Sequence, residues 1–332
     1  MLRKKIGVVL FQLGGPDSIE AIEPFLYNLF CDPDIIDFPF ARIARQPLAR
    51  LIATRRAKYV AHHYAGIGGK SPLLEFTRRQ AVALERELNR DFDARVAVAM
   101  RYWHPFTEEA IRELAMHAAD EVVLLPLYPQ YSKTTTGSSV NEWNRRFEPN
   151  GWNPRTHLVR EFFEDSAYLD SVVQAVNASL SHFDDHADLD IIFSAHSVPL
   201  AVIERGDPYQ RQIERTVDLV WQKGGWSARR HICYQSKVGA SKWLRPSMHE
   251  TIRNVAAAGS HHVLVVPISF VSDHVETLHE IDIEHRGQAL QLGIHDYRMM
   301  PGLNDSPGFI AALGGLVRGC IAKPKYAAMA GG

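Results

Sequence analysis

Three glutamates, Glu276, Glu280 and Glu284, stand four residues apart after a very apolar segment, 263–267. Side chains at positions i and i+4 share a face of an α-helix, so a helix here would place the carboxylates in one row. Neighbouring carboxylates repel one another by roughly a few tenths of a kcal/mol per exposed pair. A functional row would attract a metal ion or pass protons. The alternative is a solvated acidic face on which Asp273 and Glu276 form a capping box. The spacing alone leaves both interpretations open.

A histidine, His196, follows the apolar run 191–193 within the segment Ser-Ala-His-Ser-Val-Pro. A histidine at a strand end is well placed to face a ligand, although a hydrogen-bonded structural histidine is the common alternative. Imidazole and carboxylate ligands both suit Fe²⁺, so His196 together with Glu276 predicts a site for that ion. Neutral imidazole can also accept a proton near neutral pH.

Short apolar runs that alternate with longer amphipathic stretches must position these side chains. Strands are expected at 6–13, 95–100, 121–127, 157–161, 190–195, 230–236, 263–269 and 295–299. Helices are expected from a capping box at Asp17 and Glu20 to about Phe30, from Pro105 onward, and at 167–183 and 209–224. This alternation predicts parallel sheets flanked by helices, in two similar Rossmann-like domains at 1–165 and 166–320. Ligands of such sheets bind at the carboxyl ends of the strands.

The composition narrows the class of protein. The chain has 332 residues, 37 Lys and Arg against 38 Asp and Glu, so a nucleic-acid partner is not favoured. Cys31, Cys233 and Cys320 are odd in number and form no CxxC pair, so no thiolate zinc site is expected. The N-terminus shows no signal-peptide pattern, and no run reaches the roughly 18 apolar residues of a membrane span. We therefore expect a cytoplasmic protein.

Three other segments give weaker indications of function. The stretch Ile35–Ile52 mixes apolar residues with arginines, which would suit a membrane surface, a cover over an apolar ligand or an ordinary surface helix. The run Thr134–Ser139 contains hydroxyls and a glycine but lacks GxxxxGK[ST], and Gly14-Gly15-Pro16 lacks GxGxxG. A nucleotide-binding interpretation is therefore weak, and the hydroxyl run could simply cap the following helix.

Nine short segments, in order, carry a more specific signal. They are Leu-Gly-Gly-Pro (13–16), Gly-Gly-Lys-Ser-Pro (68–72), Met-Arg-Tyr-Trp-His-Pro (100–105), Tyr-Pro-Gln-Tyr-Ser (128–132), Thr-Thr-Gly-Ser-Ser (135–139), Ser-Ala-His-Ser-Val-Pro (194–199), Arg-Gly-Asp-Pro-Tyr (205–209), Tyr-Gln-Ser-Lys-Val-Gly (234–239) and Ser-Asp-His-Val-Glu-Thr-Leu (272–278). Together they resemble ferrochelatases of the protoporphyrin-using kind, from Gly7 to about Leu316.

The resemblance implies two Rossmann-like domains with a porphyrin cleft between them. It implies insertion of Fe²⁺ into protoporphyrin IX, the last step of haem synthesis, by a monomer that contacts the inner membrane face through the Ile35–Ile52 lip. His196, Glu276 and Glu280 match catalytic positions, and His196 and Glu276 match those that face the metal. The positions that match the porphyrin-binding set are Leu13, Arg56, Ser71, Arg101, Tyr102 and Ser236.

One departure from some relatives concerns an iron–sulfur cluster. Those relatives hold a [2Fe–2S] cluster on one cysteine after Tyr-Pro-Gln-Tyr-Ser and three near the C-terminus. Here Lys133 takes the first position, and Cys320 alone lies near the C-terminus, so no cluster is expected. Neither Lys133 nor Trp103 is assigned a role. Two alternatives stay open: another tetrapyrrole chelatase, using coproporphyrin or cobalt, and a non-catalytic haem carrier, which would not need His196 together with the glutamates.

Overall fold

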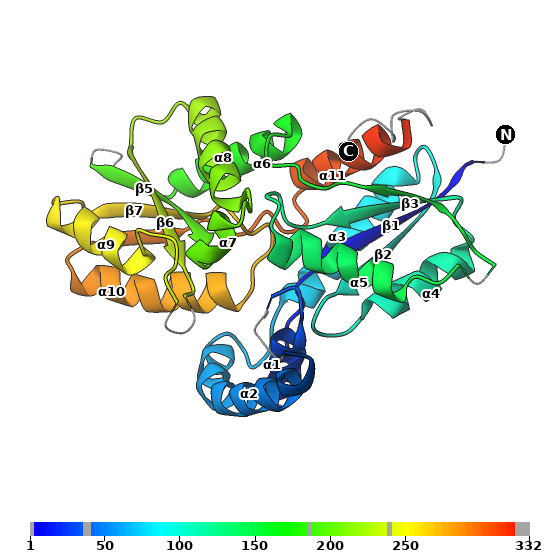
Figure 1. Cartoon of the computed structure of the whole chain (residues 1–332). Coiled ribbons are helices and arrows are strands. Elements are labelled where there is room, and N and C mark those ends of the chain that lie inside the picture. The colour runs from blue at the N-terminus through cyan, green and yellow to red at the C-terminus, as the bar shows by residue number, and fades with distance from the viewer. Residues whose placement is uncertain (1–2, 36–40, 150, 185–187, 238–240, 323–332) are drawn as a thin grey trace.

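Two four-stranded parallel sheets, each flanked by helices, form the protein (Figure 1). The computed structural model describes residues 3–35, 41–149, 151–184, 188–237 and 241–322. The strand order is β2-β1-β3-β4 in the first sheet and β6-β5-β7-β8 in the second. The strands are β1 (Lys5–Gln12), β2 (Asp93–Met100), β3 (Glu121–Pro126), β4 (Arg155–Leu158), β5 (Leu189–His196), β6 (Arg229–Gln235), β7 (His262–Pro267) and β8 (Asp296–Met299).

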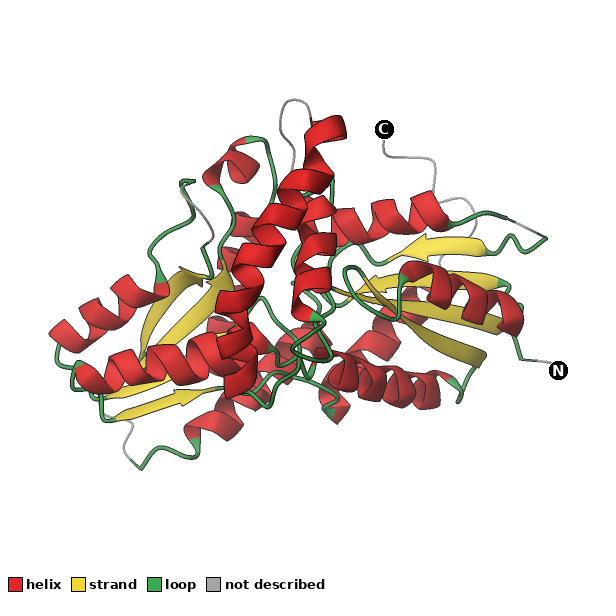
Figure 2. Cartoon of the chain, turned by 90° about the horizontal axis from the view of Figure 1, so that it is seen from below, coloured by secondary structure: helices red, strands yellow, loops and turns green. Residues whose placement is uncertain are grey.

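The helices cover both faces of each sheet (Figure 2). They are α1 (Ile22–Cys31), α2 (Ala41–Gly66), α3 (Leu73–Leu88), α4 (Thr107–His117), α5 (Ser138–Arg146), α6 (Ser166–Leu180), α7 (Leu200–Glu204), α8 (Tyr209–Gly224), α9 (Met248–Ala257), α10 (Arg286–Gln291) and α11 (Pro307–Ala322). Two π-helices, η1 (Lys133–Gly137) and η2 (Glu276–His285), run into α5 and α10. Helices on both faces bury the central strands, which explains why β1 is buried at every residue except Lys5.

One apolar core joins the two halves. It runs from β1, β2 and β3 through α3, α6 and α8 to β5 and β7. Helix α11 follows the second sheet in the chain, yet it packs against α6, α3 and β3. The C-terminal helix therefore ties the halves together, and we keep the division at 165/166 as a proposal.

Several boundaries differ from the sequence-based prediction for local reasons. Helix α1 begins at Ile22, because residues 17–21 form bends in which the Ser18 hydroxyl accepts from the Ala21 N–H at 3.2 Å. Helix α4 begins at Thr107, two residues after Pro105, and the Glu109 carboxylate accepts from the Phe106 N–H at 2.7 Å. The capping box expected at Asp17 is therefore wrong. The helix predicted at 209–224 is confirmed as α8.

The basic, apolar stretch belongs mainly to α2, a 26-residue helix that packs against α1 below the two sheets in Figure 1. Residues 36–40 of the predicted lip lie outside the described residues. Within the described chain, no helix combines the length and apolarity that crossing a membrane would require.

Candidate active site

The ring of His196 and the carboxylate of Glu276 form the centre of the candidate site. His196 is the last residue of β5, and its backbone is held on both sides. Its N–H donates to the Ser269 hydroxyl, and its carbonyl accepts from the Tyr209 hydroxyl, both at 3.0 Å. Its Nδ1 lies 3.1 Å from Glu276 Oε2, while 35% of the His196 side chain remains exposed. The fold therefore orients one ring nitrogen and leaves the ring accessible.

A second imidazole faces the same carboxylate oxygen. His274 Nε2 lies 3.3 Å from Glu276 Oε2, and His274 Nδ1 lies 3.1 Å from the Ser272 carbonyl. A carbonyl only accepts, so Nδ1 of His274 donates to it. Glu276 Oε2 therefore lies within reach of one nitrogen from each of two imidazole rings.

The charges of this pair stabilise each other. Burial would raise the pKa of Glu276, but the adjacent His196 and His274 rings hold it well below its usual range. Burial would likewise lower the pKa of His196, but the carboxylate of Glu276, by charge and by hydrogen bond, raises it above 6.5. Glu276 therefore carries a negative charge at neutral pH, and His196 keeps its proton to a higher pH than a free imidazole.

The neighbouring carboxyl of Glu280 behaves in the opposite way. Burial and the negative charge of Glu276 raise the pKa of Glu280 to about 7, although it accepts hydrogen bonds from Ser236. The Ser236 N–H donates at 2.8 Å, and its hydroxyl donates to the second oxygen. Ser236 has φ of +65°, in the left-handed region that side chains rarely adopt. Glu280 is thus a carboxyl that can take up and release a proton near neutral pH.

The three glutamates do not form the single row that α-helical spacing predicts. They lie on a π-helix, whose hydrogen bonds run from i to i+5, so residues four apart no longer stack directly. Glu276 contacts β5, Glu280 contacts the end of β6, and Glu284 faces His63 of α2 at 3.8 Å. Glu276 bonds to two imidazoles and makes no capping box, which contradicts the capping interpretation.

Two predicted porphyrin-binding residues belong to a buried network in the first half. Tyr102 is fully buried, and its hydroxyl donates to Asp32. The Arg101 guanidinium lies 3.1 Å from Asp32 and 3.6 Å from Glu142, and it donates to the Ser138 hydroxyl at 2.8 Å. Burial would raise the pKa of Asp32, but Arg101 and the two hydroxyls lower it. Ser138 of the predicted hydroxyl run therefore serves this network, and the side chain that caps η1 is that of Ser132.

Three other predicted porphyrin-binding residues lie near α1, α2 and α3, whereas Ser236 follows β6 and bonds to Glu280. Leu13 packs in the apolar cluster of α1 and α2. Ser71 is buried, its hydroxyl accepts from the Leu73 N–H at 3.3 Å, and it packs so closely on Gly15 that any side chain there would collide with it. Arg56 lies on α2, and its buried Nε has no hydrogen-bond partner among the described residues.

Helix α2 lies closer to the reactive centre than the sequence indicated. Burial, with the charge of Glu276, raises the pKa of Tyr64 on α2 far above its usual value. The preceding residue, His63, stacks on His279 of η2 with ring centroids 4.4 Å apart. Sequence reasoning missed His63, Tyr64 and His279, and the only available signal was the pair of adjacent histidines at 62 and 63.

Comparison with known proteins decides the family. The sequence model of the ferrochelatase family matches residues 5–320. A ferrochelatase from Aquifex aeolicus (strain VF5) is 45% identical over 315 residues, 95% of this chain and 99% of that protein. One from Geobacter metallireducens is 45% identical over 318 residues, 96% and 99% of the two chains. This chain belongs to the ferrochelatase family. The predicted resemblance is confirmed.

Solved structures confirm the fold of this ferrochelatase-family chain. SirB from Bacillus subtilis with Fe³⁺ is 12% identical, covers 96% of both chains and has a TM-score of 0.56. The sirohydrochlorin chelatase SirB from Bacillus subtilis subspecies spizizenii in complex with cobalt has a TM-score of 0.54 at 12% identity, over 95% of this chain and 94% of that one. At this identity the likeness concerns the fold alone, and it confirms the predicted pair of helix-flanked parallel sheets.

Proposed function

We propose that this chain inserts Fe²⁺ into protoporphyrin IX and releases two protons, as a ferrochelatase. The observation that carries the proposal is the His196–Glu276 pair at the end of β5, with one ring nitrogen bound to the carboxylate and the ring still accessible. Imidazole nitrogen and carboxylate oxygen are both ligands for ferrous iron, which is a substrate here. Membership of the ferrochelatase family supports the same reaction.

Each pyrrole N–H must lose its proton as iron enters, so the site needs a base. In this proposal His196 accepts a pyrrole proton in its neutral form through the nitrogen that does not face Glu276. Glu276 stabilises the resulting imidazolium, because its own pKa is held low. Glu280, whose pKa is about 7, then carries the proton toward Ser236 and solvent. Both pyrrole protons leave by this route, and one Fe²⁺ ion then binds the nitrogen atoms that have lost them.

The porphyrin contacts are proposed from the matching positions. Arg56 and Ser236 anchor the propionates with Ser71, while Leu13 contacts the ring beside them. The unpartnered Nε of Arg56 supports such an anchor, since a buried guanidinium nitrogen favours an anionic ligand. Arg101 and Tyr102 belong to the opposite wall, where Tyr102 is fully buried and supports the wall from within. The network with Asp32 holds both side chains in place.

The proposal also includes the location of the protein and its partners. We infer a cytoplasmic monomer, without an iron–sulfur cluster or nucleic-acid partner, that touches the inner membrane face through the Ile35–Ile52 lip. Arg50 and the half-exposed Leu51 on α2 support this orientation, because basic and apolar side chains together suit an anionic lipid surface.

The test is to mix purified protein anaerobically with Fe²⁺ and protoporphyrin IX and to follow the haem spectrum over many turnovers. Parallel reactions with coproporphyrin and with Co²⁺ separate this activity from another tetrapyrrole chelatase. Binding of haem without catalytic formation of haem would instead indicate a carrier and would overturn the proposal.

A further inference from the structure

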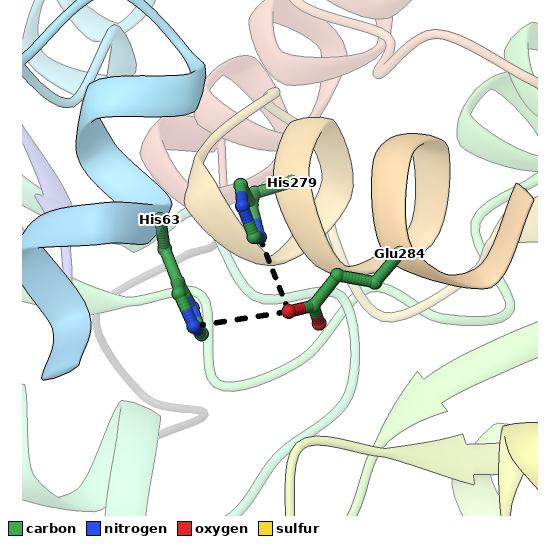
Figure 3. Close-up of side chains that lie close together, drawn as sticks. All are labelled: His63, His279 and Glu284. Atoms are coloured by element: carbon green, nitrogen blue, oxygen red, sulfur yellow. Dashed lines mark ion pairs between the residues drawn. The ribbon is translucent and has the colours of Figure 1, made fainter. Parts of the chain in front are cut away.

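A second group of metal-ligating side chains lies further along η2 than the His196–Glu276 pair. His63 of α2 and His279 and Glu284 of η2 converge there (Figure 3). One ligand atom from each lies within 4.8 Å of the others. Glu284 follows Glu276 by eight residues on η2, which is up to about 12 Å along a helix axis. The group is therefore distinct from the His196–Glu276 pair.

Helices α2 and η2 approach closely at this point because α2 ends in a glycine. A Cβ on Gly66 would lie 3.0 Å from the His279 ring, tighter than ordinary packing. The small residue lets His63 and His279 come face to face, with ring planes only 7° apart. Two segments that are more than 200 residues apart in the sequence thereby share one cluster.

One nitrogen in the cluster is buried without a hydrogen-bond partner. The His279 side chain is only 5% exposed, and its Nδ1 has no partner among the described residues. That nitrogen faces Glu284 Oε1 at 3.7 Å, which is too long for a hydrogen bond. A buried polar atom normally has a partner, so an unpartnered nitrogen aimed at a carboxylate points to a missing ligand between them.

The spacing and the ligand types fit a transition ion. Glu284 Oε1 lies 3.8 Å from His63 Nε2 and 3.7 Å from His279 Nδ1. Two ligands that are each about 2.1 Å from a tetrahedral ion stand roughly 3.4 Å apart, so these two glutamate–histidine distances need to contract by only a few tenths of an ångström. Two imidazoles with one carboxylate favour Zn²⁺, Co²⁺ or Fe²⁺ over Mg²⁺ and Ca²⁺, which prefer oxygen ligands.

We propose that His63, His279 and Glu284 form a second divalent-metal site, selective for borderline ions such as Zn²⁺ and Co²⁺, that links α2 to η2. The bound ion clamps the basic helix α2 against the π-helix that carries Glu276 and Glu280. Because imidazole lone pairs lie in the ring plane, coordination turns the two rings out of their present stack.

The experiment measures metal binding at this cluster in a protein whose His196–Glu276 site is disrupted. The His196→Ala protein, in which the His196–Glu276 pair is broken, is titrated with Co²⁺ and with Zn²⁺. We expect one ion per chain, the visible absorption of nitrogen-coordinated Co²⁺, and a rise in melting temperature that millimolar Mg²⁺ does not reproduce. Adding His63→Gln or His279→Phe should weaken binding at least tenfold. Phenylalanine keeps the ring bulk without nitrogen atoms.

The matched control is His62→Ala. His62 is exposed and lies next to His63, with its ring centroid 5.9 Å from that of His279, yet it is outside the ligand group. This variant should bind the ion as the parent does. Unchanged affinity in His63→Gln would overturn the proposal, as would equal loss in His62→Ala. If His279→Phe does not fold, His63→Gln alone decides.

Discussion

The two halves repeat one sheet topology but use their buried carboxylates in opposite ways. Each sheet has its first strand between its second and third, followed at the edge by its fourth. In the first half, Asp32 faces a guanidinium and two hydroxyls, which lower its pKa. In the second half, Glu276 faces two imidazoles, and its charge raises the pKa of Glu280 to about 7. The first half thus holds fixed charges, and the second holds groups that titrate.

This difference explains how one fold can supply both a support and a reactive centre. Arginine keeps its proton at every accessible pH, so a carboxylate beside it stays charged and its geometry stays constant. Imidazole and a second carboxyl exchange protons near neutral pH. The reaction proposed above releases protons, and of these two buried carboxylate networks the one in the second half holds groups that can receive them.

The largest effect is expected from removing the base. His196→Ala should lower kcat at least about 1,000-fold, equal to about 4 kcal/mol of barrier, while the protein still folds and binds porphyrin. His104→Ala is the matched control in the first half, where an exposed histidine pairs with Glu109 at 2.9 Å, and it should react normally. Metallation by His196→Ala at near the normal rate would remove His196 from the mechanism.

The second-largest effect is expected on the unfolding free energy, from a substitution in the first half. Asp32→Asn removes the negative charge beside Arg101 without changing the shape, and it should cost about 3 kcal/mol of unfolding free energy. Because Asp32 holds Arg101 and Tyr102 at the proposed porphyrin wall, the KM for porphyrin should rise as well. Asp34→Asn breaks the ion pair with Arg145, whose side chain is 40% exposed, and should cost less than about 1 kcal/mol. Denaturant unfolding of both variants measures this, and equal costs would refute the fixed-charge description.

A third substitution separates catalysis from capping. Glu276→Gln keeps an acceptor but loses the charge that a metal ligand or proton carrier needs, so kcat should fall at least about tenfold, or about 1.4 kcal/mol. Unfolding free energy should also fall at neutral pH, because the lowered pKa of Glu276 means that its charge stabilises the folded protein. The pH at which kcat/KM reaches half its maximum should also move down, because Glu276 no longer raises the pKa of His196.

The control for this substitution is a glutamate that does cap a helix. Glu250 accepts from the Ser247 N–H at 2.8 Å, while the Ser247 hydroxyl accepts from the Glu250 N–H at 3.3 Å. Glu250→Gln should leave kcat unchanged. Normal turnover with lost stability in Glu276→Gln would show that Glu276 only supports the helix.

The smallest effect concerns the pH dependence of stability at Glu280. Its pKa is near 4.5 in the unfolded chain and about 7 in the folded protein, so the folded state binds the extra proton between these values. Its contribution to stability is therefore present below about pH 4.5 and is lost as pH rises through 7. Glu280→Gln should remove this decline, so its melting temperature relative to the parent should rise by a few degrees from pH 5 to pH 8. A constant difference across that range would contradict the raised pKa.

Much of the fold follows from local patterns. Apolar runs that alternate with amphipathic stretches predict the eight strands and the presence of two similar sheets. They do so because strands that are buried on both faces consist of nearly continuous apolar residues. The end of β5 was predicted within one residue, so His196 could be placed at a sheet edge where ligands bind. Chemistry paired His196 with Glu276 in the sequence, and the structure places His196 Nδ1 3.1 Å from Glu276 Oε2.

Tertiary structure decided what local patterns do not encode. Spacing in the sequence predicts an α-helical row of glutamates, whereas the π-helix η2 sends Glu280 to Ser236 and Glu284 to His63. The pKa of Glu280 depends on burial and on the distance to Glu276, neither of which its neighbours in the chain determine. The approach of α2 to η2, which brings His63 onto His279, depends on packing between segments that are distant in the sequence. Residue types and strand ends were therefore predictable, while the directions of the side chains and their protonation depend on contacts between segments that are distant in the chain.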